Sequence, residues 1–448
     1  MSYSFSLPTT GAVSFVDYVD STNSSVSTKI ADATAQRGRL RAVLKGMKKE
    51  THSERDYQLL INTIEEYLPY LIGLVNCIES KEVALKKDIE TSWRSTLSDH
   101  IIHTGSNAPR ITCKDIQYEL IFVLMTYAYA CTLKANEILR ISSSPYDHHH
   151  GVNGDGTSTS NNSHSSAVNA DTYNKATNLL NTAAGVFHTV ANDVIPTWQP
   201  NGSNSNNSKD SDNSSSSSSS ISSNSSKPVE TNREFAIALS KMTLADAQAV
   251  AISKALVTSN ISKSLTAKLY MGVVDQYEMA FGLINSIPSG TQEVTTDLKK
   301  YLSDGTLYYK AMAKKYLAMD ANHHQKMGQA CGFARDAKAE LKSLQQHSIT
   351  KAAAHKLKKL SSSGTATTIA VAMKAAKEEE IVADMLSQYQ MINDKVSYEP
   401  VPSRQELQTL IPGGRNLLEL KHFALPEPMF GPSVKKEEKT YLLEGRYF

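Results

Sequence analysis

Histidine and glycine runs are the parts of this sequence whose residue types could bind a metal ion or a phosphate. His148, His149 and His150 are consecutive, so their imidazoles diverge, and a solvated polar run is favoured over a zinc site. The segment Gly151–Gly156 (GVNGDG) has no strand pattern before it and no helix pattern after it, which indicates a flexible loop rather than nucleotide binding. The Walker A phosphate-loop, HExxH and GxSxG patterns do not occur.

Two further sites could carry chemistry or recognition. His323 and His324 are expected to begin a helix as a solvated polar turn, because no serine, cysteine or carboxylate stands beside them at a recognisable catalytic spacing. The run YLPYL around Pro69 resembles short tyrosine-proline binding motifs, but its place in an amphipathic pattern favours core packing around a proline kink. We therefore predict a protein that is not an enzyme and that needs no cofactor or metal.

Composition limits the class of partner and the compartment. The 448 residues include 47 basic and 45 acidic side chains, so no overall field favours nucleic acid. The four cysteines form no CxxC pair, and the N-terminus has no signal-peptide pattern, which together favour a cytoplasmic protein. The most apolar stretch, Leu120–Leu133, has too few residues to span a bilayer, so we expect a core helix and no transmembrane segment. Any membrane association must then come from a surface or a partner.

The remaining pattern is helical almost throughout. The clearest periodicity lies in Thr296–Met319, which is followed by a predicted turn at Asp320–Asn322 and a second apolar face. Two helices joined in this way form a hairpin of the tetratricopeptide kind, although no strict repeat of 34 residues is present. We expect helices over Ile30–Met47, Glu54–Glu79, Asp115–Arg140, Thr172–Val194, Glu234–Ser259, Ser262–Ile287, Thr296–Met319, Asn322–His347 and Ile369–Val396.

Segments outside the helices define the domain organisation. Residues 1–25 predict an extended or short-strand arm, and the prolines after Ser397 predict an extended tail that packs along the domain. Ser/Asn-rich residues 142–170 and 201–227 predict disordered insertions. Neither flank of these insertions has enough helices to close a core, so we expect one domain over residues 1–432. Residues 433–448 form a short charged tail.

Several stretches resemble a known family, and they occur in that family's order. They are similar to the PalC family of fungal pH-response regulators, which are built on a Bro-type (BRO) domain, and LADAQAV is similar to Bro-type domains in general. The resemblance covers nearly the whole chain except the two insertions. The stretches are MSYSFSLPTTG at 1–11 with Phe15, EYLPYL at 66–71, WRSTLS at 93–98, YELIFVL at 118–124, YAYA at 127–130, LADAQAV at 244–250, residues 318–341, and RNLLELK at 415–421 followed by Pro426.

This resemblance implies a fold and a function. The fold would be an all-α, boomerang-shaped BRO domain with an irregular tetratricopeptide-like solenoid core. The function would be a non-enzymatic adaptor in alkaline pH signalling, recruited peripherally to the plasma membrane or endosomes. It would link a plasma-membrane pH-sensor complex to ESCRT-III by binding a C-terminal amphipathic helix of the polymer-forming subunit. The pathway would end in activation of a transcription factor by a calpain-like protease. The alternative is a BRO-domain adaptor in endosomal or multivesicular-body sorting.

A bound helix needs apolar anchors on the domain surface. The predicted helix Glu234–Ser259 has two apolar stripes, and only one of them can face the core. One stripe contains Asp246, which suits an exposed surface, so we predict that this stripe forms the partner groove. The predicted groove residues are Phe235, Leu239, Met242 and Asp246, with Tyr301 and Tyr308 as secondary candidates; core burial is the favoured interpretation for Tyr308.

Overall fold

The computed structural model of the chain describes residues 2–20, 24–51, 54–99, 107–142, 162–198, 227–288, 294–355 and 363–432. This part contains ten α-helices and four short strands. The helices are α1 (Ser24–Met47), α2 (Tyr57–Glu79), α3 (Ile116–Ser142), α4 (Asn162–Thr189), α5 (Arg233–Thr258), α6 (Lys263–Ser286), α7 (Thr296–His323), α8 (Met327–His355), α9 (Ser363–Ile392) and α10 (Arg404–Thr409).

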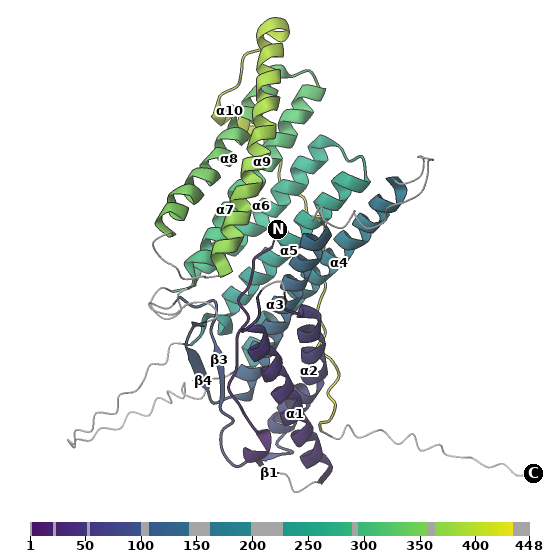
Figure 1. Cartoon of the computed structure of the whole chain (residues 1–448), viewed down its shortest axis with the longest axis vertical. Coiled ribbons are helices and arrows are strands. Elements are labelled where there is room, and N and C mark those ends of the chain that lie inside the picture. The colour runs from purple at the N-terminus through teal and green to yellow at the C-terminus, as the bar shows by residue number, and fades with distance from the viewer. Residues whose placement is uncertain are drawn as a thin grey trace, which may run out of the picture.

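The long helices form an elongated stack. Each helix from α1 to α9 packs beside the next helix in the chain, with α1 at one end and α9 at the other (Figure 1). Buried apolar side chains from all nine helices join one continuous core cluster, apart from a small satellite cluster that involves α3, α4 and α5. The all-α, solenoid-like fold predicted from the sequence is confirmed.

The turn between α7 and α8 lies farther along the chain than the sequence predicts. Residues 320–322 are still helical, and the chain reverses after His324, where Gln325 adopts a left-handed φ of 60°. The predicted turn at Asp320–Asn322 is therefore wrong, because asparagine and aspartate are turn formers that a long packed helix can still absorb. His323 ends α7 and His324 caps it, so these histidines do not begin a helix.

Four short strands lie near the end of the stack that carries α1. β1 (Val19–Asp20) pairs with β2 (Ala84–Leu85), and β3 (Thr91–Arg94) pairs antiparallel with β4 (Arg110–Cys113). The N-terminal arm joins the second ribbon, because Thr10 forms a bridge to Trp93. Of these pairings, the sequence indicated only the extended arm.

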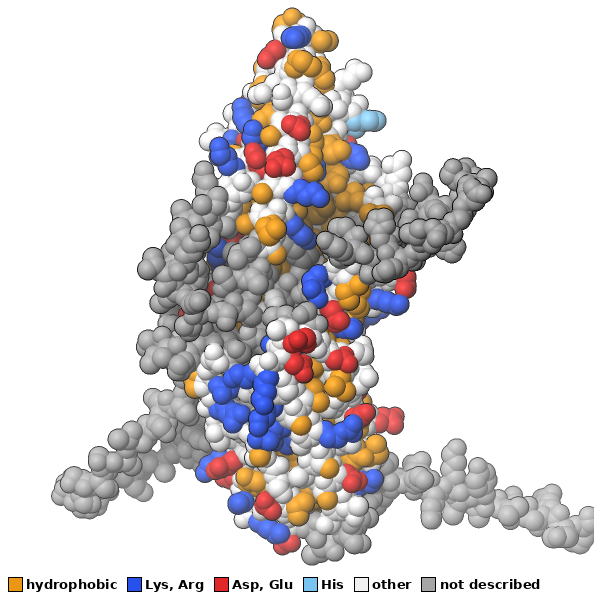
Figure 2. Space-filling model, viewed as in Figure 1, with side chains coloured by type: hydrophobic (Ala, Val, Ile, Leu, Met, Phe, Trp, Pro, Cys, Tyr) orange, Lys and Arg blue, Asp and Glu red, His pale blue; other side chains and the backbone are white. Residues whose placement is uncertain are grey.

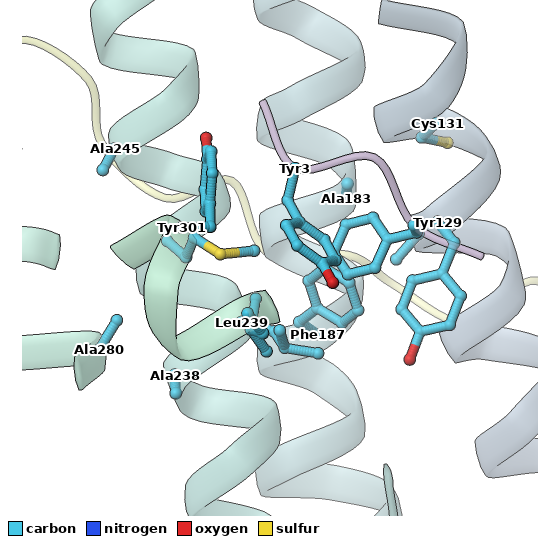
Figure 3. Close-up of a cluster of buried hydrophobic side chains, with 14 of the residues drawn as sticks. Tyr3, Tyr129, Cys131, Ala183, Phe187, Ala238, Leu239, Ala245, Ala280 and Tyr301 are labelled. Atoms are coloured by element: carbon cyan, nitrogen blue, oxygen red, sulfur yellow. The ribbon is translucent and has the colours of Figure 1, made fainter. Parts of the chain in front are cut away.

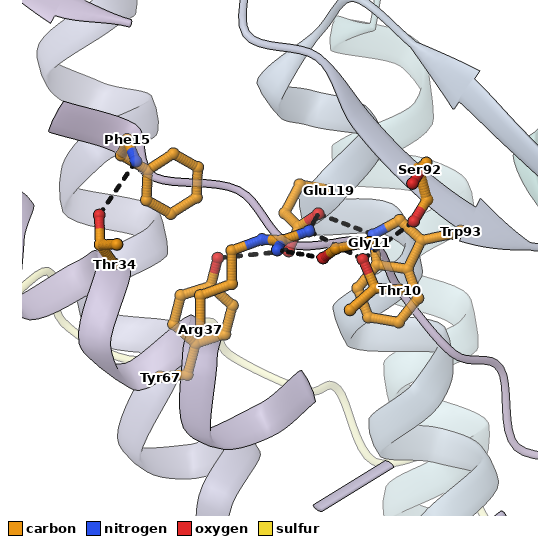
Figure 4. Close-up of polar contacts among 9 residues, drawn as sticks. All are labelled: Thr10, Gly11, Phe15, Thr34, Arg37, Tyr67, Ser92, Trp93 and Glu119. Carbon is orange, nitrogen blue, oxygen red and sulfur yellow. Dashed lines mark hydrogen bonds and ion pairs between the residues drawn. The ribbon is translucent and has the colours of Figure 1, made fainter. Parts of the chain in front are cut away.

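A buried ion pair ties the arm to the first three helices (Figure 4). The Arg37 guanidinium on α1 donates to both carboxylate oxygens of Glu119 on α3, at 2.9 and 3.0 Å. It also donates to the Gly11 carbonyl and the Thr10 hydroxyl of the arm, each at 2.8 Å. The Trp93 indole N–H donates to Glu119 at 2.7 Å. With both charges fully buried, removal of either partner would leave an uncompensated charge in the core.

The C-terminal tail crosses the even-numbered helices α8, α6, α4 and α2 in turn, and at each crossing the helix presents a glycine. A Cβ atom at these glycines would overlap the tail, mostly at a backbone carbonyl, so a larger residue would push the tail off the helix. The pairs are Gly328 with Pro400, Gly332 with Leu407, Gly272 with Arg415, Gly185 with Lys421, and Gly73 with Phe430.

Two amide side chains hold the tail between these crossings. The Gln248 side chain on α5 donates to the Arg415 carbonyl at 3.1 Å and accepts from the Leu417 N–H at 3.0 Å. Asn181 on α4 does the same for the next part of the tail, with the Glu419 carbonyl and the Lys421 N–H at 3.0 and 3.1 Å. Each amide therefore satisfies one backbone donor and one acceptor of an extended strand.

Two sequence expectations need correction at their boundaries. Residues 162–170, expected to lie in a disordered insertion, form the first turns of α4, since an established helix extends at low cost. The tail is not wholly extended, because α10 forms behind a capping box made by Ser403 and Glu406. Residues 143–161, which contain the three-histidine run, and residues 201–226 and 433–448 lie outside the described residues.

Two described helices are long and apolar enough to cross a bilayer when only length and composition are considered. They are Ile116–Ile141 and Arg233–Thr258, and their most apolar windows are 100% and 78% buried inside the fold. Core helices of a folded domain meet the same criteria, so these two helices are accounted for by the core.

The tail crossings can be tested with two glycines of the same helix. We expect Gly272→Ala to lower the free energy of unfolding by about 1–3 kcal/mol, because the new Cβ meets the Arg415 carbonyl. Gly282→Ala, where nothing lies within 4 Å of the added Cβ, should raise it by about 0.5–1 kcal/mol. Urea unfolding followed by circular dichroism measures both values, and equal effects at the two positions would contradict the crossing.

Candidate helix-binding face

Helix α5 has apolar residues on two opposite sides because it lies in the middle of the stack. With 100° per residue, Phe235, Leu239, Met242 and Asp246 lie on one side, and Ile237, Leu244, Gln248 and Ala251 lie on the other. Gln248 contacts the C-terminal tail, so the second side is the tail side. The first side faces the N-terminal arm, because the Tyr3 backbone N–H bonds to Asp246.

The predicted groove stripe is covered by the arm. Phe235, Leu239 and Met242 are at most 1% exposed. Figure 3 shows Tyr3 of the arm beside Leu239, with Phe187 and Tyr129 around them and the tail behind the helices. Phe5 of the arm stacks on Tyr129 at a centroid distance of 4.4 Å.

Asp246 is fully buried, and its environment explains why a carboxyl group can lie there. The Tyr301 hydroxyl donates to Asp246 Oδ1 at 2.8 Å, the Tyr277 hydroxyl donates to the same oxygen, and the two hydroxyls lie 3.0 Å apart. Burial raises the pKa of Asp246 to about 7, although these hydrogen bonds and the Tyr3 N–H oppose the rise. The carboxyl group therefore belongs to a core network rather than to a groove rim.

The two secondary candidates are also in the core. Tyr301 is 1% exposed and lies in the Asp246 network, while Tyr308 is 8% exposed and packs edge-on against Tyr309. The expected core burial of Tyr308 agrees with its position. The expected surface position of the Phe235, Leu239, Met242 and Asp246 stripe is wrong, because the polar residue that suggested exposure has buried hydrogen-bond partners.

The tail side of α5 holds the apolar residues that remain accessible. Ile237, Leu244 and Ala251 are half-buried, whereas Ala247 is buried. They belong to the second apolar stripe of this helix, which the prediction from the sequence left to face the core. Ile237, Leu244 and Ala251 are 11, 4 and 3 residues away from Gln248, so they lie on the face of α5 over which the tail passes.

Helix α6 extends this apolar surface. Gly272 and Asp275 of α6 lie against tail residues Arg415 and Gly414, and Met279 follows Gly272 by two helical turns on the same face. Gln248 Nε2 donates to the Leu269 carbonyl at 2.8 Å. Helices α5 and α6 run antiparallel, so a residue ten positions before Gln248 lies level with a residue ten positions after Leu269. Ala238 is therefore level with Met279, which is 42% exposed.

We call the surface formed by Ile237, Lys241, Leu244, Met279 and Leu283 the α5–α6 strip. Its apolar members are half-buried or exposed, and Lys241 is half-buried at its centre. Apolar anchors with a cation among them can bind the apolar face of an amphipathic helix and pair with an acid on its flank. No periodicity in the sequence could identify the strip, because its exposure depends on where the tail runs.

Side chains that could bind a metal ion do not gather in the described part of the chain. No group of three or more histidine, cysteine or acidic side chains is placed to hold a metal ion there. Tyr67 of the tyrosine-proline run is buried, and its hydroxyl lies 3.4 Å from Glu119. The predicted core packing around Pro69 therefore agrees with the position of Tyr67.

The family follows from these features together with sequence comparison. Residues 12–423 match the BRO1-like domain, and the chain therefore belongs to the BRO1-like domain family. Over its full length it is similar to the pH-response regulator protein palC of Cryptococcus neoformans var. neoformans serotype D (strain B-3501A), with 27% identity, covering 100% of this chain and 99% of that protein. The palC protein of Yarrowia lipolytica (strain CLIB 122 / E 150) is 30% identical over 139 residues, which are 31% of this chain and 30% of that protein.

Solved structures share the fold. ALIX BRO1 in a complex with CHMP4C superposes with a TM-score of 0.59 at 15% identity, covering 97% of this chain and 99% of that chain. A structure described as the basis for endosomal targeting by the Bro1 domain gives a TM-score of 0.55 at 14% identity, covering 94% and 92%. The family predicted from the sequence is confirmed.

The buried carboxyl group of Asp246 makes the free energy of unfolding depend on pH. The pKa of Asp246 is about 7 in the folded chain against an ordinary value of 3.8. Between these two pH values the folded chain keeps a proton on Asp246, whereas the unfolded chain has released it. The free energy of unfolding should therefore fall as pH rises from about 4 to about 7. Asp246→Asn is neutral in both states and should flatten this slope. The difference in the free energy of unfolding between wild type and variant should change by about 2.5 kcal/mol between pH 5 and 7.5.

Urea unfolding at several pH values measures this slope. The exposed Asp384→Asn on α9 is the matched control and should keep the wild-type slope. An unchanged slope in Asp246→Asn would mean that the carboxyl group is ionised in the folded chain at pH 5.

Proposed function

We propose that this chain is a non-enzymatic pH-response adaptor that joins a membrane pH-sensor complex to ESCRT-III. The observation that carries the proposal is the full-length similarity to a palC pH-response regulator. Such an adaptor acts in the cytoplasm and reaches the plasma membrane or endosomes through its partners. Its signal would lead to cleavage of a transcription factor by a calpain-like protease.

The proposed ESCRT-III contact is a helix laid on the α5–α6 strip. A BRO1 domain of the same fold has been solved in a complex with CHMP4C, and this supports the proposed class of partner. The strip offers Ile237, Leu244 and Met279 as anchors, and it lies on rigid helices rather than on a loop. The arm side of α5 is closed by Tyr3 and Phe5, so a helix could bind there only if the arm left its site.

A binding measurement tests the strip. We expect Leu244→Asp combined with Met279→Asp to weaken binding of a synthetic C-terminal amphipathic helix of the polymer-forming subunit at least tenfold, because both anchors would become charged. Isothermal titration calorimetry gives the affinity, and the circular dichroism melting curve verifies that the variant folds.

Met373→Asp on α9 is the matched control, since Met373 is 69% exposed and lies far along the stack from α5. It should bind like the wild type. Undiminished binding by the Leu244 and Met279 variant would remove the strip from the proposal.

A cellular experiment separates this function from the alternative, a BRO-domain adaptor in endosomal or multivesicular-body sorting. Deletion of the gene should abolish proteolytic processing of the transcription factor at alkaline pH, while sorting of multivesicular-body cargo continues. An immunoblot of the factor and microscopy of a tagged cargo provide the two readouts. Normal processing together with missorted cargo would instead support the alternative, which the endosomal-targeting Bro1 neighbour favours.

A further inference from the structure

A cluster of four cations lies where the end of α1 meets the β3–β4 ribbon. Arg41 and Lys48 are seven residues apart, so they lie on the same side at the end of α1. Arg94 and Arg110 are direct cross-strand partners in the β3–β4 register. Figure 2 shows Lys and Arg side chains gathered over the region where Figure 1 draws α1 beside these strands.

The cluster is not neutralised within the described residues. None of its four side chains takes part in an ion pair there, although the chain as a whole is nearly balanced, with 47 basic and 45 acidic residues. Arg41 Nε is buried and has no hydrogen-bond partner among the described groups. Two arginines directly opposite each other destabilise a ribbon, so the fold maintains this arrangement at a cost.

The four cations act on one another. Partial burial lowers the pKa of Lys48, and the charges of Arg94 and Arg110 lower it further. Burial, followed by Arg94 and Arg41, lowers the pKa of Arg110. An anion placed among these groups would relieve the mutual repulsion.

One arginine of the cluster is held in place. Arg94 Nε donates to the Thr9 hydroxyl at 2.9 Å, and its Nη1 donates to the carbonyls of Asn107 and Ala108. Arg41, Lys48 and Arg110 have no comparable fixed partners in the described part of the chain. Three cations are thus free to contact a ligand around a fixed fourth.

We propose that this cluster, Arg41, Lys48, Arg94 and Arg110, docks the phosphate monoesters of inositol-lipid headgroups at a membrane surface. Three of the four are arginines, whose planar forks fit phosphate oxygens in pairs. A phosphate monoester brings about 1.5 to 2 negative charges to one point, which suits a dense cation cluster better than a singly charged headgroup does.

A lipid headgroup is favoured over a phosphopeptide as the ligand of the cluster, because of how this chain can contact a bilayer. The two helices long enough to span a membrane are in the core, whereas a surface cluster of cations can attract an anionic bilayer directly. The choice of a membrane also rests on the proposed function, which places the adaptor next to a membrane-bound sensor complex.

The test uses the full chain and vesicles sedimented with bound protein. The probes are phosphatidylcholine vesicles with phosphatidylinositol bisphosphate, with phosphatidylserine at equal surface charge, or without an anionic lipid. We expect binding mainly to the first, with Arg41→Gln, Lys48→Gln and Arg110→Gln together reducing it by roughly 100-fold, at about fivefold per cation. Arg94 is left unchanged because it holds the arm.

The matched control is Lys342→Gln, Lys377→Gln and Lys395→Gln, which removes the same charge from exposed positions on α8, α9 and the π-helical segment Asn393–Ser397 that follows α9. It should bind vesicles like the wild type. The cluster variant should melt no lower than the wild type, because a repulsive group has been removed, and it should bind the ESCRT-III helix normally. That last measurement separates a failure of this site from a failure of the proposed function.

Several outcomes would overturn the site. Equal binding to the phosphatidylserine vesicles would reduce the cluster to general electrostatic attraction and exclude monoester recognition. Binding of free inositol phosphates or of a phosphopeptide, without any binding to vesicles, would exclude the lipid. Equal loss of binding in the cluster and control variants would show that overall charge, rather than these residues, is responsible.

Discussion

A stack of helices has two faces to cover, and this constraint explains most of the structure. A middle helix such as α5 packs against α4 and α6 and also meets Tyr301 of α7, but the apolar residues on its two sides extend beyond these helices and need other partners. The N-terminal arm covers one face and the C-terminal tail covers the other. Neither segment is helical over most of its length, because an extended chain crosses many helices with few residues. The glycines of the even-numbered helices let the tail come close enough to be held by Gln248 and Asn181.

The coverage of the two faces decides where a partner could bind. On the arm face, Tyr3 and Phe5 fill the space between α3, α5 and α7, and Asp246 finds hydrogen-bond donors there. The tail is narrower than the face it crosses, so apolar side chains beside it, such as Leu244 and Met279, stay partly open. The exposed strip therefore results from incomplete coverage, and its anchors lie on helices that the tail itself fixes in place.

The sequence was sufficient to predict the helices, but not to predict which of their faces the arm and the tail cover. Apolar periodicity located the long helices, with most ends within a few residues, because a packed helix must repeat its apolar side every turn. The same periodicity gave α5 two stripes and could not say which one was covered by the arm. Asp246 indicated a surface only because its partners, Tyr277 and Tyr301, lie 31 and 55 residues away. The short ribbon of β3 and β4 was missed for a similar reason, since its stability comes from the arm and α3 rather than from a strand pattern.

The arm connects features that are far apart in the sequence. Its Tyr3 contacts the Asp246 network, Thr10 and Gly11 satisfy the Arg37 guanidinium, and Thr9 holds Arg94 of the cation cluster. A charge buried as deeply as that of Arg37 needs every one of its donors satisfied. The core ion pair and the geometry of the cation cluster thus depend on the same few residues of extended chain. The arm is therefore as much a part of the domain as any helix, and its docking links the packing of α5 to the charge distribution at the end of α1.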